Sequence, residues 1–372
     1  MQKIPILDLK RQIKPIRKEL DAAIKRVVDS AHFILGEEIA DFEHAVEKYC
    51  RIKYAVAVSN GTDAIKLSLL SLGIQPGEGV ICPAFTYYAT AGAIVSMGAV
   101  PVFADIDPDT YNISVSGAEA VIRQRKSLKI KAILPVHLYG QCADMEAIAM
   151  LAGKYRLKII EDTAQAFGAE YKGRKAGTMA DCAAVSFFPG KNLGAFGDAG
   201  MILTDNQPVA EKLRLLRNQG NKEKYYHSLL GYNHRMDALQ AAILKVKLKY
   251  LDSWNKKRQA NAAYFNRAFR GLNIRTPYVA EGARHIYHQY VLRVSHSSAK
   301  LIEHLKNKGI DARVYYPLAL HLQPCFKYLG YKRGDFSESE RASQEVLAIP
   351  VYPDLTQKEM DYIIEAVKEF LP

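Results

Sequence analysis

Residues 158–205 read KIIEDTAQAFGAEYKGRKAGTMADCAAVSFFPGKNLGAFGDAGMILTD, and this segment contains two short apolar runs. The first run, KIIE, ends at Asp162, and the second, CAAVS, leads through Ser186 into a loop that carries Lys191. A short apolar run bounded by turn residues is typical of a buried strand. The segment therefore predicts two strands that place a carboxylate and an amine just beyond their ends.

An acid at a strand end and a lysine on a nearby loop are the pair that pyridoxal 5'-phosphate (PLP) requires. The lysine can bond to the cofactor aldehyde, and the acid can pair with the protonated pyridine nitrogen, which makes the ring an electron sink. Alone, each residue has an ordinary explanation, because most lysines are solvated surface charges and an aspartate after a strand is often a helix cap. The combination predicts a PLP site built on Asp162 and Lys191.

Apolar runs alternate with helical patterns along the first two thirds of the chain. The predicted strands are 54–58, 79–82, 100–103, one that begins at 132, 157–161, 183–187 and 201–204. This alternation predicts an α/β fold with a largely parallel sheet, in which ligands gather beyond the carboxyl ends of the strands. Gly61, Tyr87, His137, Asp162 and Lys191 all fall at such ends.

A glycine turn opens the helix that follows the first strand, in the sequence SNGTD at residues 59–63. The N-terminus of a helix binds anions because its free N–H groups and the positive end of its dipole face the ligand. An ordinary capped helix is the alternative. Because Lys191 is present, we expect Gly61 and Thr62 to bind the cofactor phosphate.

The spelling EDTAQAFGA at 161–169, followed by SFFPGKNLGAFGDAG at 186–200, resembles the sugar aminotransferases of the DegT/DnrJ/StrS family. The stretches DIDPDTYN at 105–112, GYNHRMDALQAA at 231–242 and HLQP at 321–324 extend the resemblance over nearly the whole chain. The resemblance implies an aspartate-aminotransferase-like fold (PLP fold type I), with a large, mostly parallel sheet domain and a smaller α+β C-terminal domain.

The resemblance also implies contacts to the cofactor. Gln165 matches a residue at the 3-oxygen edge of the ring, and Ser186 matches a phosphate ligand. Tyr87 matches an aromatic residue stacked on the pyridine, although the adjacent Tyr88 leaves a one-residue ambiguity and either ring could belong to the core. Asn233 matches an asparagine that reaches the phosphate of the other subunit, which implies a homodimer with shared active sites.

Two residues of the C-terminal part are candidate substrate contacts. His321 begins the HLQP element, which lines the substrate side in the family, and Tyr316 precedes it in the segment VYYP. A histidine simply packed in a proline-containing loop is an equal alternative for His321.

The implied reaction is transamination from L-glutamate to a nucleotide-diphospho-keto sugar in deoxyamino-sugar biosynthesis, with Lys191 moving the proton as a neutral amine. The motifs PGKNLGAFGDAG and LGYNHRMDALQAAILKVKLKYLD are most similar to those of enzymes that act on dTDP-3-keto-6-deoxyhexoses. A 4-keto sugar, a keto-uronate or a keto-cyclitol is an alternative acceptor. The dehydratase branch, in which a histidine replaces the lysine, is disfavoured by Lys191, and a non-catalytic PLP-binding regulator is a further alternative.

Composition is that of a soluble globular protein, with 49% apolar and 24% charged residues in 372. We expect no membrane span, because no apolar run of about 18 residues occurs, and no signal peptide, because the first twelve residues carry charges. The net charge of +12 is spread along the chain without a nucleic-acid motif, so we expect it to attract the sugar nucleotide rather than nucleic acid.

The five cysteines are odd in number and widely spaced, which argues against disulfides and a zinc site and predicts buried thiols in a reducing cytoplasm. Asp105, Asp107 and Asp109 lack the glycine and glutamate of a calcium loop, so we expect no metal. We expect a large PLP-binding domain at 1–250, with an N-terminal helical segment, and a small one at 251–372. A continuous helix over 237–269, about 50 Å long, would bridge them.

Overall fold

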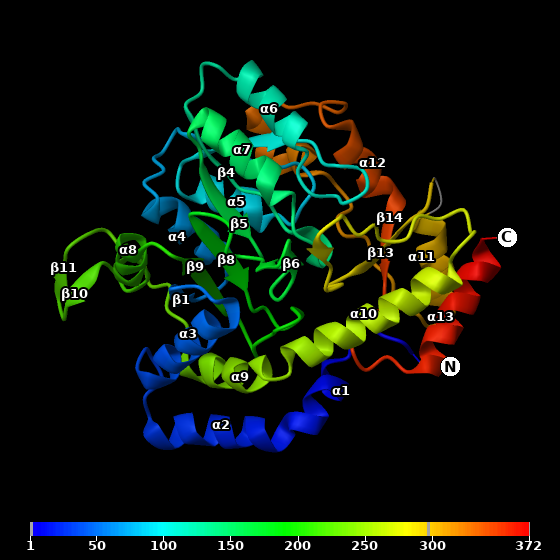
Figure 1. The fold of residues 1–372 in the computed structure, drawn as a ribbon, viewed down its shortest axis with the longest axis horizontal. Coiled ribbons are helices and arrows are strands. Elements are labelled where there is room, and N and C mark those ends of the chain that lie inside the picture. The colour runs from blue at the N-terminus through cyan, green and yellow to red at the C-terminus, as the bar shows by residue number, and fades with distance from the viewer. Residues whose placement is uncertain (1–2, 296–297, 372) are drawn as a thin grey trace.

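A seven-stranded sheet forms the centre of the protein in the computed structural model, which describes residues 3–295 and 298–371 (Figure 1). The strands are β1 (Tyr54–Val58), β2 (Gly79–Pro83), β3 (Val100–Ala104), β4 (Ile130–Ile133), β5 (Lys158–Asp162), β8 (Cys182–Ser186) and β9 (Gly200–Thr204). Their order is β1-β9-β8-β5-β4-β2-β3, and β9 alone runs antiparallel to its neighbours in this sheet. The predicted α/β class with a largely parallel sheet is confirmed.

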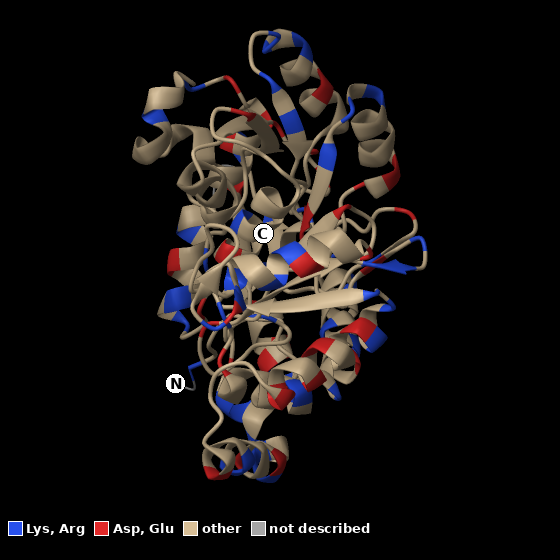
Figure 2. Ribbon diagram, turned by 90° about the vertical axis from the view of Figure 1, so that its left-hand side faces the viewer, with Lys and Arg blue, Asp and Glu red and all other residues tan. Residues whose placement is uncertain are grey.

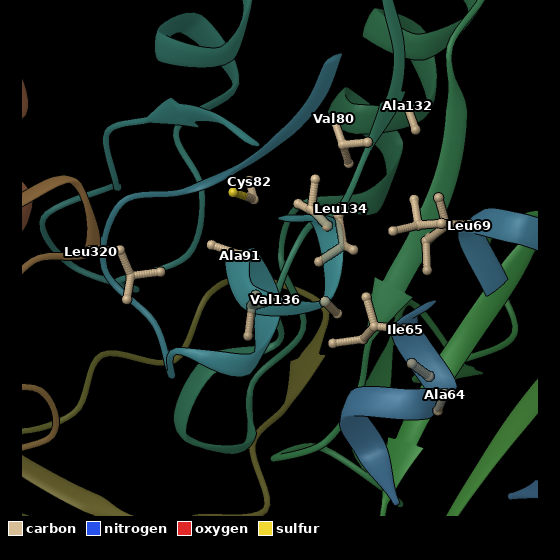
Figure 3. Packing of buried hydrophobic residues seen from close by; sticks show 14 of the residues in the cluster. Ala64, Ile65, Leu69, Val80, Cys82, Ala91, Ala132, Leu134, Val136 and Leu320 are labelled. Carbon is tan, nitrogen blue, oxygen red and sulfur yellow. The ribbon is translucent and has the colours of Figure 1, made fainter. Parts of the chain in front are cut away.

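Helices cover both faces of this sheet, because its strands are apolar on both sides. They are α3 (Glu37–Cys50), α4 (Gly61–Ser71), α5 (Ala89–Ser96), α6 (Val115–Gln124), α7 (Met145–Tyr155) and α8 (Gln207–Arg217). Successive residues of β1 enter different cores: Val56 packs in the same cluster as Ile65 of α4, whereas Ala57 packs with Phe42 of α3. Figure 3 shows the first of these cores, where Ile65 and Leu134 converge between helix and sheet.

The predicted continuous helix over 237–269 is wrong, because the structure has two helices there. They are α9 (Ala238–Leu248) and α10 (Leu251–Ala268). At the junction the amides of Lys249 and Tyr250 donate to carbonyls three residues earlier, which tightens the last turn of α9 and redirects the chain. Tyr250 stacks on Trp254 at the start of α10, 5.9 Å between ring centroids. No glycine or proline marks the break, so helical periodicity continued through it.

The N-terminal helices α1 (Leu9–Ile13) and α2 (Arg17–Ser30) lie beside the junction, and α2 packs along α9 (Figure 1). From there α10 runs toward the C-terminal part of the chain. That part has its own core around β13 (Tyr290–Arg293) and β14 (Val346–Ile349), an antiparallel pair. The helices α11 (Ser298–Asn307), α12 (Ser337–Glu345) and α13 (Gln357–Phe370) accompany this pair.

Small sheets complete the fold. The pair β10 (Asn221–Glu223) and β11 (Tyr226–His227) forms a hairpin that projects from the molecule beyond α8 (Figure 1), and β6 (Glu170–Tyr171), β7 (Arg174–Lys175) and β12 (Ala283–Arg284) form a three-stranded sheet. Basic and acidic residues are interspersed along the outer helices, in line with the scattered charge of the sequence (Figure 2).

The expectation that all five cysteines are buried is wrong for Cys325, which is exposed. It lies on a short 3₁₀ helix at the surface (residues 324–329), where the following Phe326 supplies the buried side chain. The other four thiols are buried and unpaired. Within the described ranges, no helix is both long and apolar enough to cross a bilayer.

Candidate active site

A cavity of about 690 Å³ opens at the carboxyl ends of β5 and β8, between the sheet, the start of α4 and the C-terminal part of the chain. Eight of the ten predicted site residues line it: Gly61, Thr62, Tyr87, Asp162, Gln165, Ser186, Lys191 and Tyr316. These residues come from five separate segments of the sequence, namely 61–62, 87, 162–165, 186–191 and 316. The structure thus brings most of the predicted site together at one place.

Asp162 ends β5 and is 5% exposed. Its Oδ2 accepts a hydrogen bond from the Thr90 hydroxyl (2.9 Å), and its Oδ1 accepts one from the Ala164 amide (3.1 Å). Burial raises the pKa of this carboxyl, while the two donors and the nearby Lys191 ammonium act in the opposite direction. Both oxygens are therefore held in place, and the carboxylate lines a cavity in which a cationic group could bind beside it.

Lys191 lies on a tight loop after β8. The Lys191 amide donates to the Phe188 carbonyl (2.8 Å), and the Ala195 amide donates to the Phe187 carbonyl (2.8 Å). A Cβ at Gly194 would lie 2.2 Å from the Pro189 carbonyl oxygen, so the loop can close only with glycine there.

Burial lowers the pKa of the Lys191 amine to about 8, although the Asp162 carboxylate raises it. An amine with this pKa has a far larger neutral fraction near physiological pH than an ordinary lysine, and only the neutral form is a nucleophile or a proton acceptor. The pairing of a buried acid with a partly deprotonated lysine is the central electrostatic feature of the cavity.

The start of α4 forms an anion cradle with the end of β8. The Asn60 side chain caps the Asp63 amide (2.9 Å), so the earlier amides, at Gly61 and Thr62, remain available on the cavity wall. A Cβ at Gly61 would lie 2.7 Å from the Cβ of Ser186, which shows how closely the helix start and the strand end approach. Amides, helix dipole and hydroxyl converge on one point, as a phosphate requires.

Gln165 is fixed at both ends of its amide. Its Oε1 accepts from the Tyr139 amide (2.8 Å), and its Nε2 donates to the Tyr316 hydroxyl (2.9 Å). The Tyr316 ring lies 5.9 Å from the ring of Tyr87, which is 57% exposed and lines the cavity. Tyr88 instead stacks on Phe326, 5.8 Å between centroids, so of the two adjacent tyrosines it is Tyr87 that faces the cavity.

Asn233 and His321 do not line this cavity among the described residues. Asn233 is exposed, in a backbone bridge to Asn218 before α9. The His321 side chain is buried, pairs with Glu340 through Nε2 (3.0 Å) and meets the Phe336 ring edge-on. His321 therefore has the packed environment that the sequence left open as its alternative, with an acid and an aromatic ring as its neighbours.

His137, which the sequence also put at a strand end, lies behind the site. Its Nδ1 accepts from the Ala143 amide (3.1 Å), so its Nε2 carries the proton and donates to Glu161 (2.8 Å). Glu161 also accepts the amides of Gly177 and Met179, which joins the sheet to the loop before β8. Because successive residues on a strand face opposite ways, this pair faces away from the cavity side of Asp162.

Sequence reasoning missed several polar residues of the wall, among them Arg258, His288, Gln289 and Arg313 from the last third of the chain. Arg258 is 3% exposed and comes from α10, and His288 and Gln289 precede β13. Nothing local distinguishes them: Arg258 belongs to a stretch of basic residues that would ordinarily form a solvated helix face. They become part of the site only because α10, the segment before β13 and the segment that contains Arg313 pack around one cavity.

The residues present fit PLP. The α4 amides and Ser186 suit a dianionic phosphate, Asp162 suits a protonated pyridine nitrogen, and Lys191 supplies a reactive amine. No cluster of histidine, cysteine or acidic residues suited to a metal ion occurs in the described part of the chain. These residues therefore suit a cofactor that has an anionic phosphate and a cationic ring.

Comparison with known proteins agrees with this chemistry. The profile of the DegT/DnrJ/EryC1/StrS aminotransferase family matches residues 14–368. The "Pleiotropic regulatory protein" of Geobacillus stearothermophilus is 46% identical over 99% of this chain and 98% of its own length. The dTDP-3-amino-3,4,6-trideoxy-alpha-D-glucose transaminase of Streptomyces venezuelae is 41% identical over 99% and 96%. The crystal structure of NtdA from Bacillus subtilis with bound cofactor PMP superposes with a TM-score of 0.91 at 33% identity, covering 99% of this chain and 85% of that one.

Proposed function

Because the chain belongs to the DegT/DnrJ/EryC1/StrS aminotransferase family and is thus a PLP-dependent transaminase, we propose that it aminates a nucleotide-linked keto sugar with L-glutamate as donor. The observation that carries the proposal is the convergence of Asp162, Lys191 and the α4 N-terminus on one cavity. The name of the Streptomyces relative supports a dTDP-3-keto-6-deoxyhexose as acceptor. A 4-keto sugar, a keto-uronate or a keto-cyclitol is the alternative.

When bound, the cofactor supplies an electron sink for the carbon that carries the amine. The proposed holding residues are Asp162 at the pyridine nitrogen, Gln165 at the 3-oxygen edge, Tyr87 at the ring face, and Gly61, Thr62 and Ser186 at the phosphate. The Thr90 and Ala164 donors favour the charged form of Asp162, which is the form that a protonated nitrogen needs.

Lys191 has two proposed tasks: it bonds to the cofactor aldehyde, and as a free neutral amine it moves the proton at the substrate carbon. Its lowered pKa supports both, because each task needs the neutral amine. Tyr316, joined to Gln165, is the proposed substrate contact. A substrate role for His321 stays a prediction without support from the cavity lining.

We also propose a homodimer, in which Asn233 completes the phosphate site of the partner. Its exposure and its position outside this chain's own cavity lining support that role. Residues 1–250 and 251–372 are proposed to act as two domains that face each other across the cavity, since both contribute to its wall. Unpaired thiols favour a cytoplasmic location.

A regulator that binds PLP without turnover is the second candidate, because the Geobacillus relative bears the name of a regulatory protein. An absorbance assay separates the two. With PLP bound, L-glutamate should bleach the cofactor band and yield one equivalent of 2-oxoglutarate per site. An unchanged band with no 2-oxoglutarate would overturn the proposed reaction with L-glutamate and favour the regulator. A panel of dTDP- and UDP-keto sugars, offered to the aminated enzyme, then identifies the acceptor.

A further inference from the structure

Arg258 is a buried cation without a carboxylate partner. Its Nη1 donates to the carbonyls of Tyr287 (3.1 Å) and His288 (3.3 Å), while its Nε has no acceptor among the described residues. Burial lowers the pKa of Arg258 to about 10, which reflects the cost of holding the charge away from water. The charge of the Asp354 carboxylate raises the pKa of Arg258, but the ion pair of Asp354 is with Lys257, 3.3 Å between Nζ and Oδ1.

The other two buried arginines, by contrast, have carboxylate partners. Arg217 pairs with Glu43, and Arg293 pairs with Glu338 and Glu345, both at 2.6 Å. Leaving a buried charge unpaired is strongly destabilising, so an unpaired one calls for a partner that the polypeptide does not supply. An anion bound beside Arg258 would be that partner.

Arg258 lines the active-site cavity together with Lys191 and donates to the His288 carbonyl. The His288 Nδ1 lies 3.1 Å from the Oδ1 of Asn192, the residue after Lys191. Burial lowers the pKa of His288, and the positive charges of Lys191 and Arg258 lower it further, so the imidazole is neutral. The amide oxygen of Gln289, another wall residue, is also buried without a donor. Two side chains of this wall, Arg258 and Gln289, therefore each keep a hydrogen-bonding atom without a partner.

Arg313 provides a contrast on the same wall. It also lines the cavity, but Asp311 lies 3.0 Å from its guanidinium, so its charge is already matched. Since the cofactor phosphate has its own cradle at α4, Arg258 is the cation left to meet a further anion inside the cavity.

We propose that Arg258 binds the α-carboxylate of the amino donor, and this rests on the function proposed above. An α-carboxylate is attached to the same carbon as the reacting amine, so it must lie close to the group that moves the proton at that carbon, which is Lys191. A guanidinium recognises a carboxylate through charge-assisted hydrogen bonds in a planar geometry. Arg258 thus makes the site selective for α-amino acids as donors.

Two keto acids test the inference, because 4-oxopentanoate carries a methyl group where 2-oxoglutarate carries its α-carboxylate. Each is added to the aminated holoenzyme, and conversion of the cofactor is followed by absorbance. The wild-type enzyme should use 2-oxoglutarate far better. In Arg258→Gln the 2-oxoglutarate rate constant at low concentration should fall about 10- to 100-fold, the range for a hydrogen bond to a charged group, while the 4-oxopentanoate rate stays within about threefold. Lys257→Gln, which removes a neighbouring exposed cation, is the matched control.

An unchanged preference in Arg258→Gln, or an equal loss with both acids, would overturn the inference, because either result makes the arginine structural. If that variant does not fold with PLP, Arg258→Lys is tested instead, because it keeps the charge but not the planar guanidinium. The ratio of the 2-oxoglutarate to the 4-oxopentanoate rate constant should still fall in Arg258→Lys, and an unchanged ratio would also overturn the inference. A wild-type enzyme that converts neither acid would overturn the donor proposal itself, so the two failures are distinguishable.

Discussion

The two walls of the cavity are built by different means. The proposed cofactor-phosphate wall has the backbone amides of Gly61 and Thr62 together with Ser186, each at the end of a strand or the start of the helix that follows one. The proposed amino-donor wall has side chains such as Arg258 and Tyr316, from a long helix and a C-terminal loop. The first wall is a consequence of strand–turn–helix geometry, whereas the second exists only after distant segments have packed.

The walls also differ in how they carry charge. The phosphate wall attracts an anion through a helix dipole and unpaired amides, which need no buried ion. The donor wall holds a buried guanidinium at a cost in desolvation. We therefore expect changes at the phosphate wall to affect cofactor affinity, and changes at the donor wall to affect substrate selectivity. Asp162 and Lys191, which serve both, should give the largest effects on turnover.

Replacement of Lys191 by alanine should have the largest effect, with turnover abolished and the cofactor bound only non-covalently. Borohydride reduction of wild-type holoenzyme, followed by peptide mapping, should label Lys191 alone. Lys247 is the informative competitor, because burial also lowers the pKa of its amine to about 8. A label on Lys247 would contradict the assignment, and Lys247→Met should leave the label in place.

Replacement of Asp162 by asparagine should slow proton abstraction by about 10²- to 10⁴-fold, the range of a general acid–base contribution, with cofactor still bound. The reason is that the pyridine nitrogen loses the charge that keeps it protonated. Stopped-flow absorbance with L-glutamate measures the step. Thr90→Val removes one hydrogen bond to the same carboxylate and should cost only about fivefold, about 1 kcal/mol. Near-normal rates in Asp162→Asn would refute the electron-sink role.

Mutation of Asn233 tests whether the phosphate wall is completed by a second subunit. Asn233→Ala should weaken PLP binding about tenfold, as loss of one hydrogen bond to a charged group would, and PLP removal should promote dissociation at low protein concentration. Mixing inactive Lys191→Ala chains with inactive Asn233→Asp chains should restore activity, because one site of each heterodimer carries neither lesion. If the mixture remains inactive, both residues belong to the same chain's site, and the proposal of a shared site is wrong.

Replacement of Gly61 by alanine tests the close approach at the phosphate wall. The new methyl group would lie 2.7 Å from the Ser186 Cβ, so we expect a loss of about 1–2 kcal/mol in stability and a cofactor affinity several-fold weaker. Thermal unfolding with and without PLP measures both. Gly153→Ala in α7 is the matched control, since nothing lies within 4 Å of its added Cβ, and it should be neutral or stabilising.

The pH dependence of cofactor uptake should show the smallest effect. Apoenzyme bonds covalently to PLP through the neutral Lys191 amine, so the uptake rate should rise with pH up to a midpoint near 8 and level off above it. Asp162→Asn removes the carboxylate that raises this pKa, so the midpoint should shift to lower pH. A midpoint near the ordinary lysine value, or a shift upward in the variant, would contradict the assignment.

Expectations from the sequence were reliable where a signal is local. The apolar runs that form β5 and β8, the glycine turn before α4 and the acid and lysine beyond the strands are all contiguous patterns. Parallel strands place their carboxyl ends at one sheet edge, so Asp162, Ser186 and Lys191 had to meet once those strands formed. The same reasoning failed at residues 249–250, where the break between α9 and α10 carries no glycine or proline, although residues on both sides of it pack against α2.

By itself, then, the sequence determined the sheet, the anion cradle and the reactive pair, because short-range steric rules and hydrophobic periodicity decide strands and turns. Only the tertiary structure decided which of the adjacent tyrosines faces the cavity, that His321 is packed against Glu340, and that Arg258 is buried without an acid. Those outcomes depend on which distant segments touch and on how much water they exclude. Desolvation and contact are properties of the packed chain, and no window of the sequence contains them.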